Sequence, residues 1–304
     1  MPLTSIIIPT HDRPELLPRA VESARRAGAD VEVVVVDDGS TDETSAVCAS
    51  FRDIVYVRLE KRRGVGAARV AGIAASSGMY ISFLDDDDAR LPGSIDRQLA
   101  ILQAAPDAAL VYGQAHRATQ SLAINGHRPF PQFCPSGDVF WTLIAGNFIP
   151  SCSVVARRSA IESVGGLFHE VMPADDWDLW LRIAERHPIK ALREPVSIYR
   201  QPTLWSHQGS SRLADGLLSA DLRVLERCAK LPRAIANPRE FRRAARHLKG
   251  AICLRLLAET FQAVRRGDSY ASVSFRHAIA APDGFVHAIL SPHTWRKLRE
   301  RVGS

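Results

Sequence analysis

The stretch "MYISFLDDDDARLPG", Met79 to Gly93, decides the fold prediction. A short apolar run ends in four consecutive aspartates, and a Pro-Gly pair follows. Continuous apolar runs of this kind are typical of strands that are buried on both faces of a parallel sheet. The four carboxylates repel one another unless a cation or hydrogen-bond donors keep them ionised. The stretch therefore predicts a buried strand whose end carries either an acidic surface loop or a metal site.

Further apolar runs around this stretch give the fold class. They alternate with segments of helical spacing, and no internal repeat interrupts them. One expected helix follows Pro14, and another follows Pro92-Gly93 with Ser94 as its cap. We expect an α/β fold with a mostly parallel, doubly wound sheet flanked by helices. The other strand runs are "SIIIP" (5–9), "VEVVVVD" (31–37), "IVYVRL" (54–59) and "ALVYG" (109–113).

Composition indicates an ordinary soluble protein of 304 residues. Its five cysteines are scattered without Cys-x-x-Cys spacing, which favours reduced thiols and a cytoplasmic location. The chain opens with "LTSIIIPT" after two residues, and charges break its longest apolar runs. We therefore expect neither a signal peptide nor a membrane-spanning helix.

Charge is unevenly distributed along the chain. Residues 1–200 hold 21 Lys or Arg and 25 Asp or Glu, whereas residues 201–304 hold 18 and 8, a net charge of +10. Helical patterns in this basic part run from Leu213 to Leu231 and from Phe241 to Val264. The part either contacts anionic lipid at the inner face of a membrane or a polyanionic acceptor, or it is a solvated helix surface. No nucleic-acid-binding signature is present, so we expect no nucleic-acid partner.

Polar turns follow three of the expected strands. They are "PTHDRP" (9–14), "DDGSTD" (37–42) and "DDDD" (85–88). Each turn alone has an ordinary explanation as a turn, a helix cap or a surface loop. Ligands of open parallel sheets bind outside the carboxyl ends of the strands, so the three turns are expected to converge on one site. Together they favour a divalent metal, Mg²⁺ or Mn²⁺, with remaining coordination positions left to water and diphosphate oxygens.

Two further segments follow these turns, at residues 149–170 and 174–200. Together with four earlier segments, they form an ordered set that resembles the family 2 glycosyltransferases. The four earlier segments are the expected first strand and helix (6–23), "VVVVDDGSTDET" (33–44), "RGVGAARVAGI" (63–73) and "ISFLDDDD" (81–88). The resemblance covers roughly residues 3–202. It implies a GT-A fold and inverting sugar transfer from a nucleotide-diphosphate sugar, with a UDP-sugar favoured. It also implies a catalytic domain at 1–205, with a donor half at about 1–115 and an acceptor half at about 116–205, before a basic helical region at 206–304.

The resemblance also implies roles for single residues. Asp87 and Asp88 would bind Mn²⁺ or Mg²⁺ at the donor diphosphate. Arg63 and Arg69 would neutralise phosphate charge, although a surface arginine near a helix start explains either one equally well. The residues expected to contact the donor are Pro9, Thr10, Asp12, Asp37, Asp38, Arg63, Arg69, Asp85 and Asp86.

"ADDWDLWLR", residues 174–182, supplies the expected catalytic base, Asp176. Neighbouring carboxylates and tryptophans would raise its pKa through like charge and partial burial. The alternative is a helix N-terminus whose acids complement the helix dipole, and both descriptions can hold together. Asp178 and Arg182, spaced i and i+4, are expected to form a helix-surface pair. Contacts with the acceptor or a lid are expected from Asp175, Trp177 and His207.

Departures from the family pattern leave the nucleotide and the sugar open. Val70 stands where Asn is common, Asp175 where Glu is common, and His11 and Asp12 where an aromatic residue and Asn are common. The Gln-x-x-Arg-Trp motif of processive synthases is absent from the sequence, which favours single additions to a carbohydrate or lipid-linked acceptor. Whether the protein forms a homodimer is left open.

Two other functions fit parts of the pattern. A non-catalytic nucleotide-sugar-binding protein would keep the donor turns, although Asp176 is present. A sugar-phosphate nucleotidyltransferase should carry a Gly-rich, Arg-containing loop after its first strand. "PTHDRPELL" offers no such loop, so this second alternative is the weaker one.

Overall fold

A computed structural model describes residues 3–126, 128–167, 174–200 and 214–265. The chain divides into two compact units. The first comprises Met1–Val139 and Phe148–Pro202, and the second comprises Phe140–Asn147 and Thr203–Ser304. The sequence did not indicate that residues 140–147 belong with the C-terminal region. The assignment of donor and acceptor halves to residues 1–115 and 116–205 stays a prediction.

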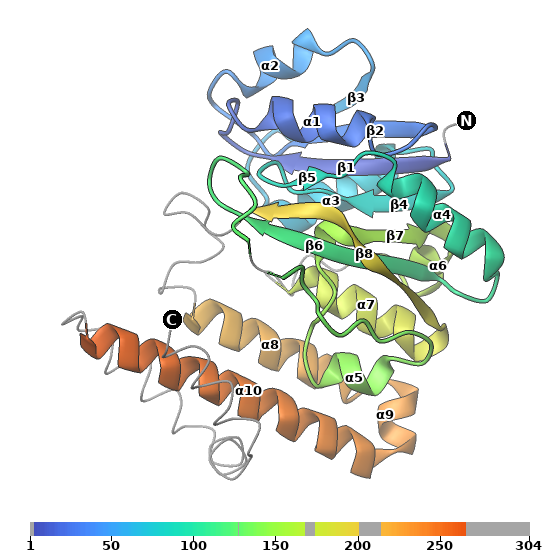
Figure 1. Ribbon diagram of the computed structural model, residues 1–304, viewed down its shortest axis with the longest axis vertical. Helices are drawn as coiled ribbons and strands as arrows, with labels where there is room; N and C mark the ends of the chain where they lie inside the picture. Colours follow the sequence, from blue (N-terminus) through green and yellow to red (C-terminus); the bar gives the residue numbers. More distant parts are fainter. Residues whose placement is uncertain (1–2, 127, 168–173, 201–213, 266–304) are drawn as a thin grey trace. The chain divides into compact units, whose positions relative to one another are not determined.

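The first unit contains an eight-stranded sheet with the strand order β3-β2-β1-β4-β7-β6-β8-β5 (Figure 1). Its apolar strands form where the sequence predicts them. The strands are β1 (Thr4–Thr10), β2 (Val31–Asp37), β3 (Ile54–Arg58), β4 (Tyr80–Phe83), β5 (Ala89–Arg90), β6 (Leu110–Ala118), β7 (Val154–Arg157) and β8 (Ile189–Arg200).

The sheet is parallel in one half and mixed in the other. Strands β3, β2, β1 and β4 pair in parallel, as do β6 and β8. Strand β7 is antiparallel to both β4 and β6, and β5 is antiparallel to β8. Because β7 runs antiparallel to β6, the strand before it in the chain, it starts at the end of the sheet where β6 finishes, and no crossover helix is needed. The α/β prediction is confirmed, but the expected parallel pairing holds mainly for the first 83 residues.

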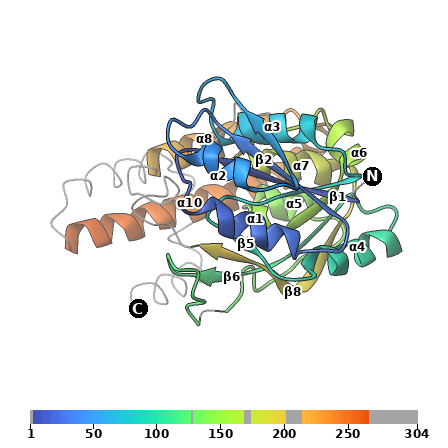
Figure 2. The ribbon, with the colours of Figure 1, turned by 90° about the horizontal axis from the view of Figure 1, so that it is seen from above.

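Helices cover both faces of the sheet in the first unit. On one face lie α1 (Leu17–Arg25), α2 (Thr44–Ser50) and α4 (Ser94–Ala104). On the other face lie α3 (Val65–Ala75) and α7 (Asp175–Arg186), with α6 (Arg158–Ser163) beside them (Figure 2). This arrangement confirms the predicted doubly wound character of the sheet.

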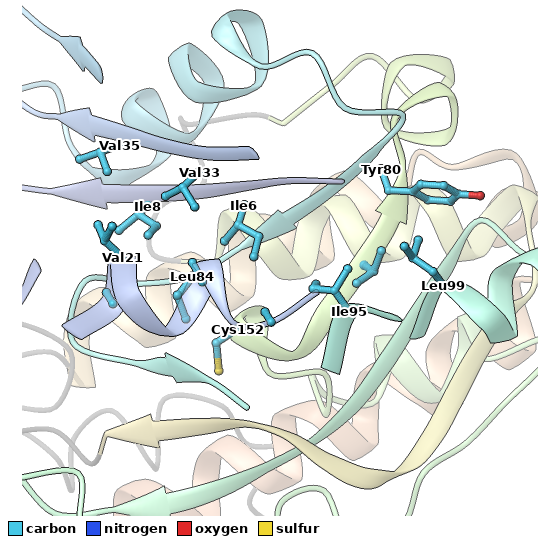
Figure 3. Packing of buried hydrophobic residues seen from close by; sticks show 14 of the residues in the cluster. Ile6, Ile8, Val21, Val33, Val35, Tyr80, Leu84, Ile95, Leu99 and Cys152 are labelled. Carbon is cyan, nitrogen blue, oxygen red and sulfur yellow. The ribbon is translucent and has the colours of Figure 1, made fainter. Parts of the chain in front are cut away.

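The hydrophobic core between the sheet and α1 and α4 follows the alternation of the strands. Ile6 and Ile8 point to this face, where they lie near Val21 of α1 and Ile95 of α4 (Figure 3). The expected cap at Ser94 is wrong. Gly93 occupies the cap position, because Ser94 already lies in the first helical turn, where its hydroxyl has no hydrogen-bond partner among the described residues.

The opposite face of β1 meets α3 at Gly72. A Cβ atom at this position would lie 2.4 Å from Cγ2 of Ile7 and 3.1 Å from Cγ2 of Val36. Only a residue without a side chain allows such a close approach between helix and sheet. The contact fixes the distance of α3 from the sheet and therefore the position of Arg69, which lies one helical turn earlier.

The second unit is helical in its described part. Its helices are α5 (Phe140–Ile144), α8 (Ala214–Cys228), α9 (Pro232–Ala236) and α10 (Pro238–Arg265). The guanidinium of Arg233 lies 4.8 Å from the ring centre of Phe140 and 5.7 Å from that of Trp141, which ties α9 to α5. The predicted helical patterns after residue 213 are thus confirmed as α8 and α10, and the short helix α9 lies between them in the sequence.

Within the described ranges, no helix combines the length and the apolar character needed to cross a bilayer. All five cysteines are buried and free of disulfides, as their spacing predicted.

Candidate functional site

The turns after β1 and β2 are joined by hydrogen bonds at the carboxyl end of the sheet. The Asp12 carboxylate accepts a bond from the Thr41 amide at 2.8 Å, and the Asp12 amide donates to the Ser40 hydroxyl at 3.0 Å. The Asp38 amide donates to the Thr10 carbonyl at 2.9 Å. The predicted convergence of these two turns is confirmed.

Asp37 is completely buried and bonded within the protein. Its carboxylate accepts bonds from the Ser40 amide and the Tyr56 hydroxyl, each at 2.8 Å. Burial raises the pKa of the Tyr56 phenol, and the hydrogen bond to Asp37 and its charge raise it further. Asp37 therefore shapes the turn, and its contact with a donor stays a prediction.

Asp38 holds the turn after β2 against the start of α3. Its two carboxylate oxygens accept bonds from the backbone amides of Arg63 and Gly64, each at 2.7 Å. Gly39 allows this approach, because it has a positive φ of 70° and a Cβ there would lie 2.6 Å from the Arg62 amide nitrogen. The Arg63 side chain is exposed, as the surface alternative for this residue requires.

The acidic turn after β4 is tied to the turn after β1. Asp86 accepts a bond from the Thr10 hydroxyl at 2.8 Å and one from the Arg13 guanidinium at 2.9 Å. Arg13 also lies 3.6 Å from the Asp87 carboxylate. Sequence reasoning did not select Arg13, although it occurs in "PTHDRP" beside residues that were selected. The third predicted turn thus joins the other two.

The remaining carboxylates of this turn form a compact cluster. One ligand oxygen from each of Asp85, Asp87 and Asp88 lies within 4.8 Å of the other two. Asp88 also accepts a bond from the Arg200 amide at the end of β8, at 2.8 Å. Asp87 and Asp88 are buried, so the alternative of an acidic surface loop is wrong.

Burial and like charge both disfavour ionisation of this turn. The pKa of Asp86 is raised to about 6 and that of Asp87 to about 7, chiefly by burial and further by neighbouring carboxylates. The pKa of Asp88 is raised well above its usual value for the same reasons. A divalent cation would compensate this charge, and carboxylate oxygens are the ligands that Mg²⁺ and Mn²⁺ prefer. Asp85, Asp87 and Asp88 therefore fit a divalent metal.

Arg69 connects the acidic turn to α7. Its Nη2 donates to Asp85 at 2.7 Å and its Nη1 donates to Asp175 at 2.9 Å, while the guanidinium lies 5.8 Å from the ring centre of Phe83. The side chain is buried, so the surface alternative for Arg69 is wrong. Both ends of its guanidinium are engaged by carboxylates, so Arg69 joins Asp85 of the acidic turn to Asp175, the residue before the predicted base.

Asp176 lies in the first turn of α7. Its pKa is raised to about 7, first by burial and then by the charge of Asp175, whereas Arg69 acts in the opposite direction. These are the two raising effects that the sequence predicts. The Trp177 amide donates to Oδ1 of Asp176 at 2.6 Å, and the Trp177 side chain is buried in the helix packing.

Asp178 and Arg182 form the predicted pair, with 2.8 Å between the Arg182 Nε and an Asp178 carboxylate oxygen. The pair is buried, however, and the expectation of a helix-surface pair is wrong. Arg182 also donates to the Val164 carbonyl at 2.6 Å, which draws the pair under the loop after α6. His207, expected at a lid or acceptor site, lies outside the described residues.

A family model described as glycosyl transferase family 2 matches residues 5–164. An uncharacterized glycosyltransferase of Rickettsia felis is 28% identical over 221 residues, covering 70% of this chain and 36% of that protein. The succinoglycan biosynthesis protein ExoO of Rhizobium meliloti is 38% identical over 108 residues, covering 34% of this chain and 31% of ExoO. The matches thus span only about a third of the length of these two relatives.

The fold is similar to that of TarS from S. aureus. One TarS crystal structure aligns with a TM-score of 0.61 at 14% identity, covering 93% of this chain and 54% of TarS. Another, of TarS residues 1–349 in complex with UDP-GlcNAc, has a TM-score of 0.57 at 17% identity, covering 91% of this chain and 89% of that one. At this level of identity the similarity concerns the fold alone.

Proposed function

Because the chain belongs to glycosyl transferase family 2, we propose that it transfers a sugar from a nucleotide-diphosphate sugar to an acceptor hydroxyl, with inversion at the anomeric carbon. The observation that carries this proposal is the pair of ion pairs made by Arg69 with Asp85 and Asp175. They bring the carboxylate cluster and the acidic start of α7 into one site. The acceptor is proposed to be a carbohydrate or a lipid-linked sugar.

We propose a UDP-sugar as the donor. The TarS complex with UDP-GlcNAc supports this choice, since its fold is similar. In this chain, the turns that hold Thr10, Asp12 and Asp38 are braced by mutual hydrogen bonds, which would hold a nucleotide-binding surface in place before the donor arrives. The departures at His11 and Asp12 lie in the same turn, so they bear on the identity of the nucleotide.

Mn²⁺ or Mg²⁺ is the proposed cofactor, held by Asp85, Asp87 and Asp88. When bound, the metal would act as a Lewis acid that stabilises negative charge on the leaving diphosphate. Arg13 and Thr10 hold Asp86 on the neighbouring side of the turn and thereby keep its backbone in one conformation. Asp85 is oriented separately, by Arg69.

Asp176 is the proposed general base. Its Oδ1 accepts the Trp177 amide bond, and Oδ2 has no hydrogen-bond partner among the residues that the structure describes. Oδ2 would take the proton of the acceptor hydroxyl while the acceptor oxygen bonds to the anomeric carbon and the bond from that carbon to the diphosphate breaks. A pKa of about 7 suits this task, because the group is partly ionised at neutral pH and binds the proton well.

The proposed location is the cytoplasm. Five free, buried cysteines support a reducing compartment, in which thiols persist without disulfides. The proposed reaction also requires that nucleotide sugars and divalent cations are available in this compartment.

Calorimetric binding of UDP, GDP and dTDP, each with and without Mn²⁺, tests the donor class and the metal site together. We expect metal-dependent binding of one nucleotide, with UDP preferred, and loss of the metal dependence in Asp87→Asn. Folded protein that binds no nucleotide would overturn the proposal.

A second experiment tests the base. Asp176→Asn should keep donor binding and lower the rate of transfer about 10²- to 10⁴-fold, the usual cost of a positioned base. Asp107→Asn is a matched control, because Asp107 is exposed in the turn before β6. Transfer at the parental rate by Asp176→Asn would mean that another residue is the base.

A further inference from the structure

One face of α10 carries four arginines. Arg239, Arg242, Arg243 and Arg246 are all exposed. At 3.6 residues per turn, their spacing places them on the same side of the helix. The opposite side of the helix holds Ala244, Ala245 and Leu248, which are buried. We call these four arginines the basic face of α10.

The basic face makes no contact that would explain it within the unit. None of its arginine side chains has a salt bridge, a hydrogen bond or a ring contact with any residue in the described ranges. Arg233 differs, because it stacks on Phe140 and Trp141. A structural role therefore accounts for Arg233 and leaves the basic face unexplained.

The spacing of the basic face has an energetic cost. Arg239 and Arg243 are four residues apart, and so are Arg242 and Arg246. Like charges at this spacing destabilise a helix. Positive charge near a helix N-terminus is also opposed by the helix dipole. An external anionic partner would turn this repulsion into attraction.

An exposed apolar residue lies close to the basic face in the sequence. Ile235 in α9 is 66% exposed and precedes Arg239 by four residues. The surrounding charge is basic as well, since residues 214–265 hold 11 Lys or Arg and 5 Asp or Glu. Basic residues with an adjacent apolar side chain match a surface of phosphates that covers a hydrocarbon layer.

We propose that the basic face of α10, with Ile235, docks on an anionic phospholipid surface. The arginines would pair with lipid phosphates, which guanidinium groups bind in a bidentate way. Ile235 would enter the boundary between headgroups and acyl chains. This binding is independent of the proposed sugar transfer, so it can be tested without donor or acceptor.

Sedimentation of the full chain with vesicles tests the proposal. We expect binding to vesicles of phosphatidylglycerol and phosphatidylcholine in equal parts, little binding to phosphatidylcholine alone, and weaker binding as sodium chloride is raised. The double variant Arg242→Gln/Arg246→Gln should bind roughly 20- to 30-fold more weakly, from the usual attraction of a basic residue to an anionic membrane.

A matched control separates the basic face from net charge. Arg52 and Arg193 are exposed in the first unit, and Arg52→Gln/Arg193→Gln removes the same charge. We expect this control to bind vesicles as the parent does. An equal loss in both double variants would overturn the proposal, because overall charge would then explain the binding.

Inorganic polyphosphate distinguishes a membrane from a soluble polyanion. Ile235→Ser should weaken vesicle binding roughly threefold to tenfold, since part of an isoleucine side chain leaves the lipid, and should leave polyphosphate binding unchanged. Folded protein that binds polyphosphate but not the anionic vesicles would overturn the proposal. Circular dichroism of each variant would establish that the overall helix content of the protein is retained.

Discussion

Two acidic turns end neighbouring parts of the parallel sheet, and they differ in how their charge is compensated. The turn at Asp37 and Asp38 is surrounded by donors: two backbone amides reach Asp38, and an amide and a phenol reach Asp37. In the turn at residues 85–88, three ligand oxygens lie within 4.8 Å of one another. The same sequence pattern, an apolar strand followed by aspartates, thus gives two different sites.

The difference shows what an aspartate pair after a strand can mean. In the first turn, each of the two carboxylates, Asp37 and Asp38, accepts hydrogen bonds from donors within the protein. The second turn has raised pKa values because its carboxylates are buried beside one another, with Arg13 and Arg69 compensating only part of the charge. We infer that the first turn is structural and that the second turn requires a ligand.

The largest expected effect is on catalysis. Asp87→Asn should lower transfer about 10²- to 10³-fold, the range found when one group that stabilises transition-state charge is removed. Without metal, its thermal midpoint should equal or exceed that of the parent, because one crowded carboxylate is gone. Transfer assays and thermal unfolding in EDTA measure the two effects. A metal-free protein that is clearly destabilised would show that the second turn is structural too.

Asp38→Ala should act on stability instead. It removes two bonds to a charged acceptor and leaves the amides of Arg63 and Gly64 without it, a loss of about 3 kcal/mol in the free energy of unfolding. Mn²⁺ affinity at the second turn should stay within about twofold, because no metal ligand has changed. Urea unfolding and Mn²⁺ titration test this. A large loss of Mn²⁺ affinity would contradict the separation of the two turns.

The metal-free protein should become more stable as pH falls from about 7 to about 5, by about 3 to 4 kcal/mol from Asp86 and Asp87 together. The sign follows from the raised pKa values of Asp86 and Asp87, about 6 and about 7. The folded state binds these protons first, so this stability is complete below the unfolded pKa and is lost as pH rises through the folded values. Urea unfolding in EDTA over this range measures it. Asp87→Asn should flatten the dependence of the free energy of unfolding on pH. An unchanged slope in this variant would mean that groups other than Asp87 cause the pH dependence.

The smallest expected effect concerns the first turn. Tyr56→Phe removes one donor to Asp37 and should cost about 1 kcal/mol of unfolding free energy. Neither Mn²⁺ affinity nor the pH profile of metal-free stability should change. Val57→Ala in the same strand is a control for packing loss without loss of a hydrogen bond. A changed Mn²⁺ affinity in Tyr56→Phe would link the two turns.

Much of the fold could be predicted because it depends on local patterns. The apolar runs of β1, β2, β3, β4 and β6 identify those strands, and the helical faces of α1 and α4 follow from spacing. The antiparallel entry of β7 and the grouping of residues 140–147 with the second unit could not be predicted. Both features depend on where the chain packs after a long connection between elements. Local sequence patterns do not encode that position.

The carboxylates of the site could be predicted, whereas Arg13 was not selected and Arg69 was expected at the site without its two carboxylate partners. Clustered acids stand out in a sequence because like charges need an explanation. Arg13 and Arg69 are ordinary in composition, and their importance comes from partners that are 73 and 106 residues away in the chain. The buried position of Arg182 was missed for a related reason, since a loop carbonyl at Val164 draws it inward.

Gly72 has a consequence for protein engineering. A methyl group there would lie 2.4 Å from Cγ2 of Ile7, so Gly72→Ala must shift either the Ile7 side chain or α3. An outward shift of α3 would carry Arg69 with it and disturb its alignment with Asp85 and Asp175. Directed evolution toward new donors or acceptors should therefore vary the loops and exclude this position. In a library that also varies this position, variants with favourable loop sequences would be lost because of a packing defect between α3 and β1.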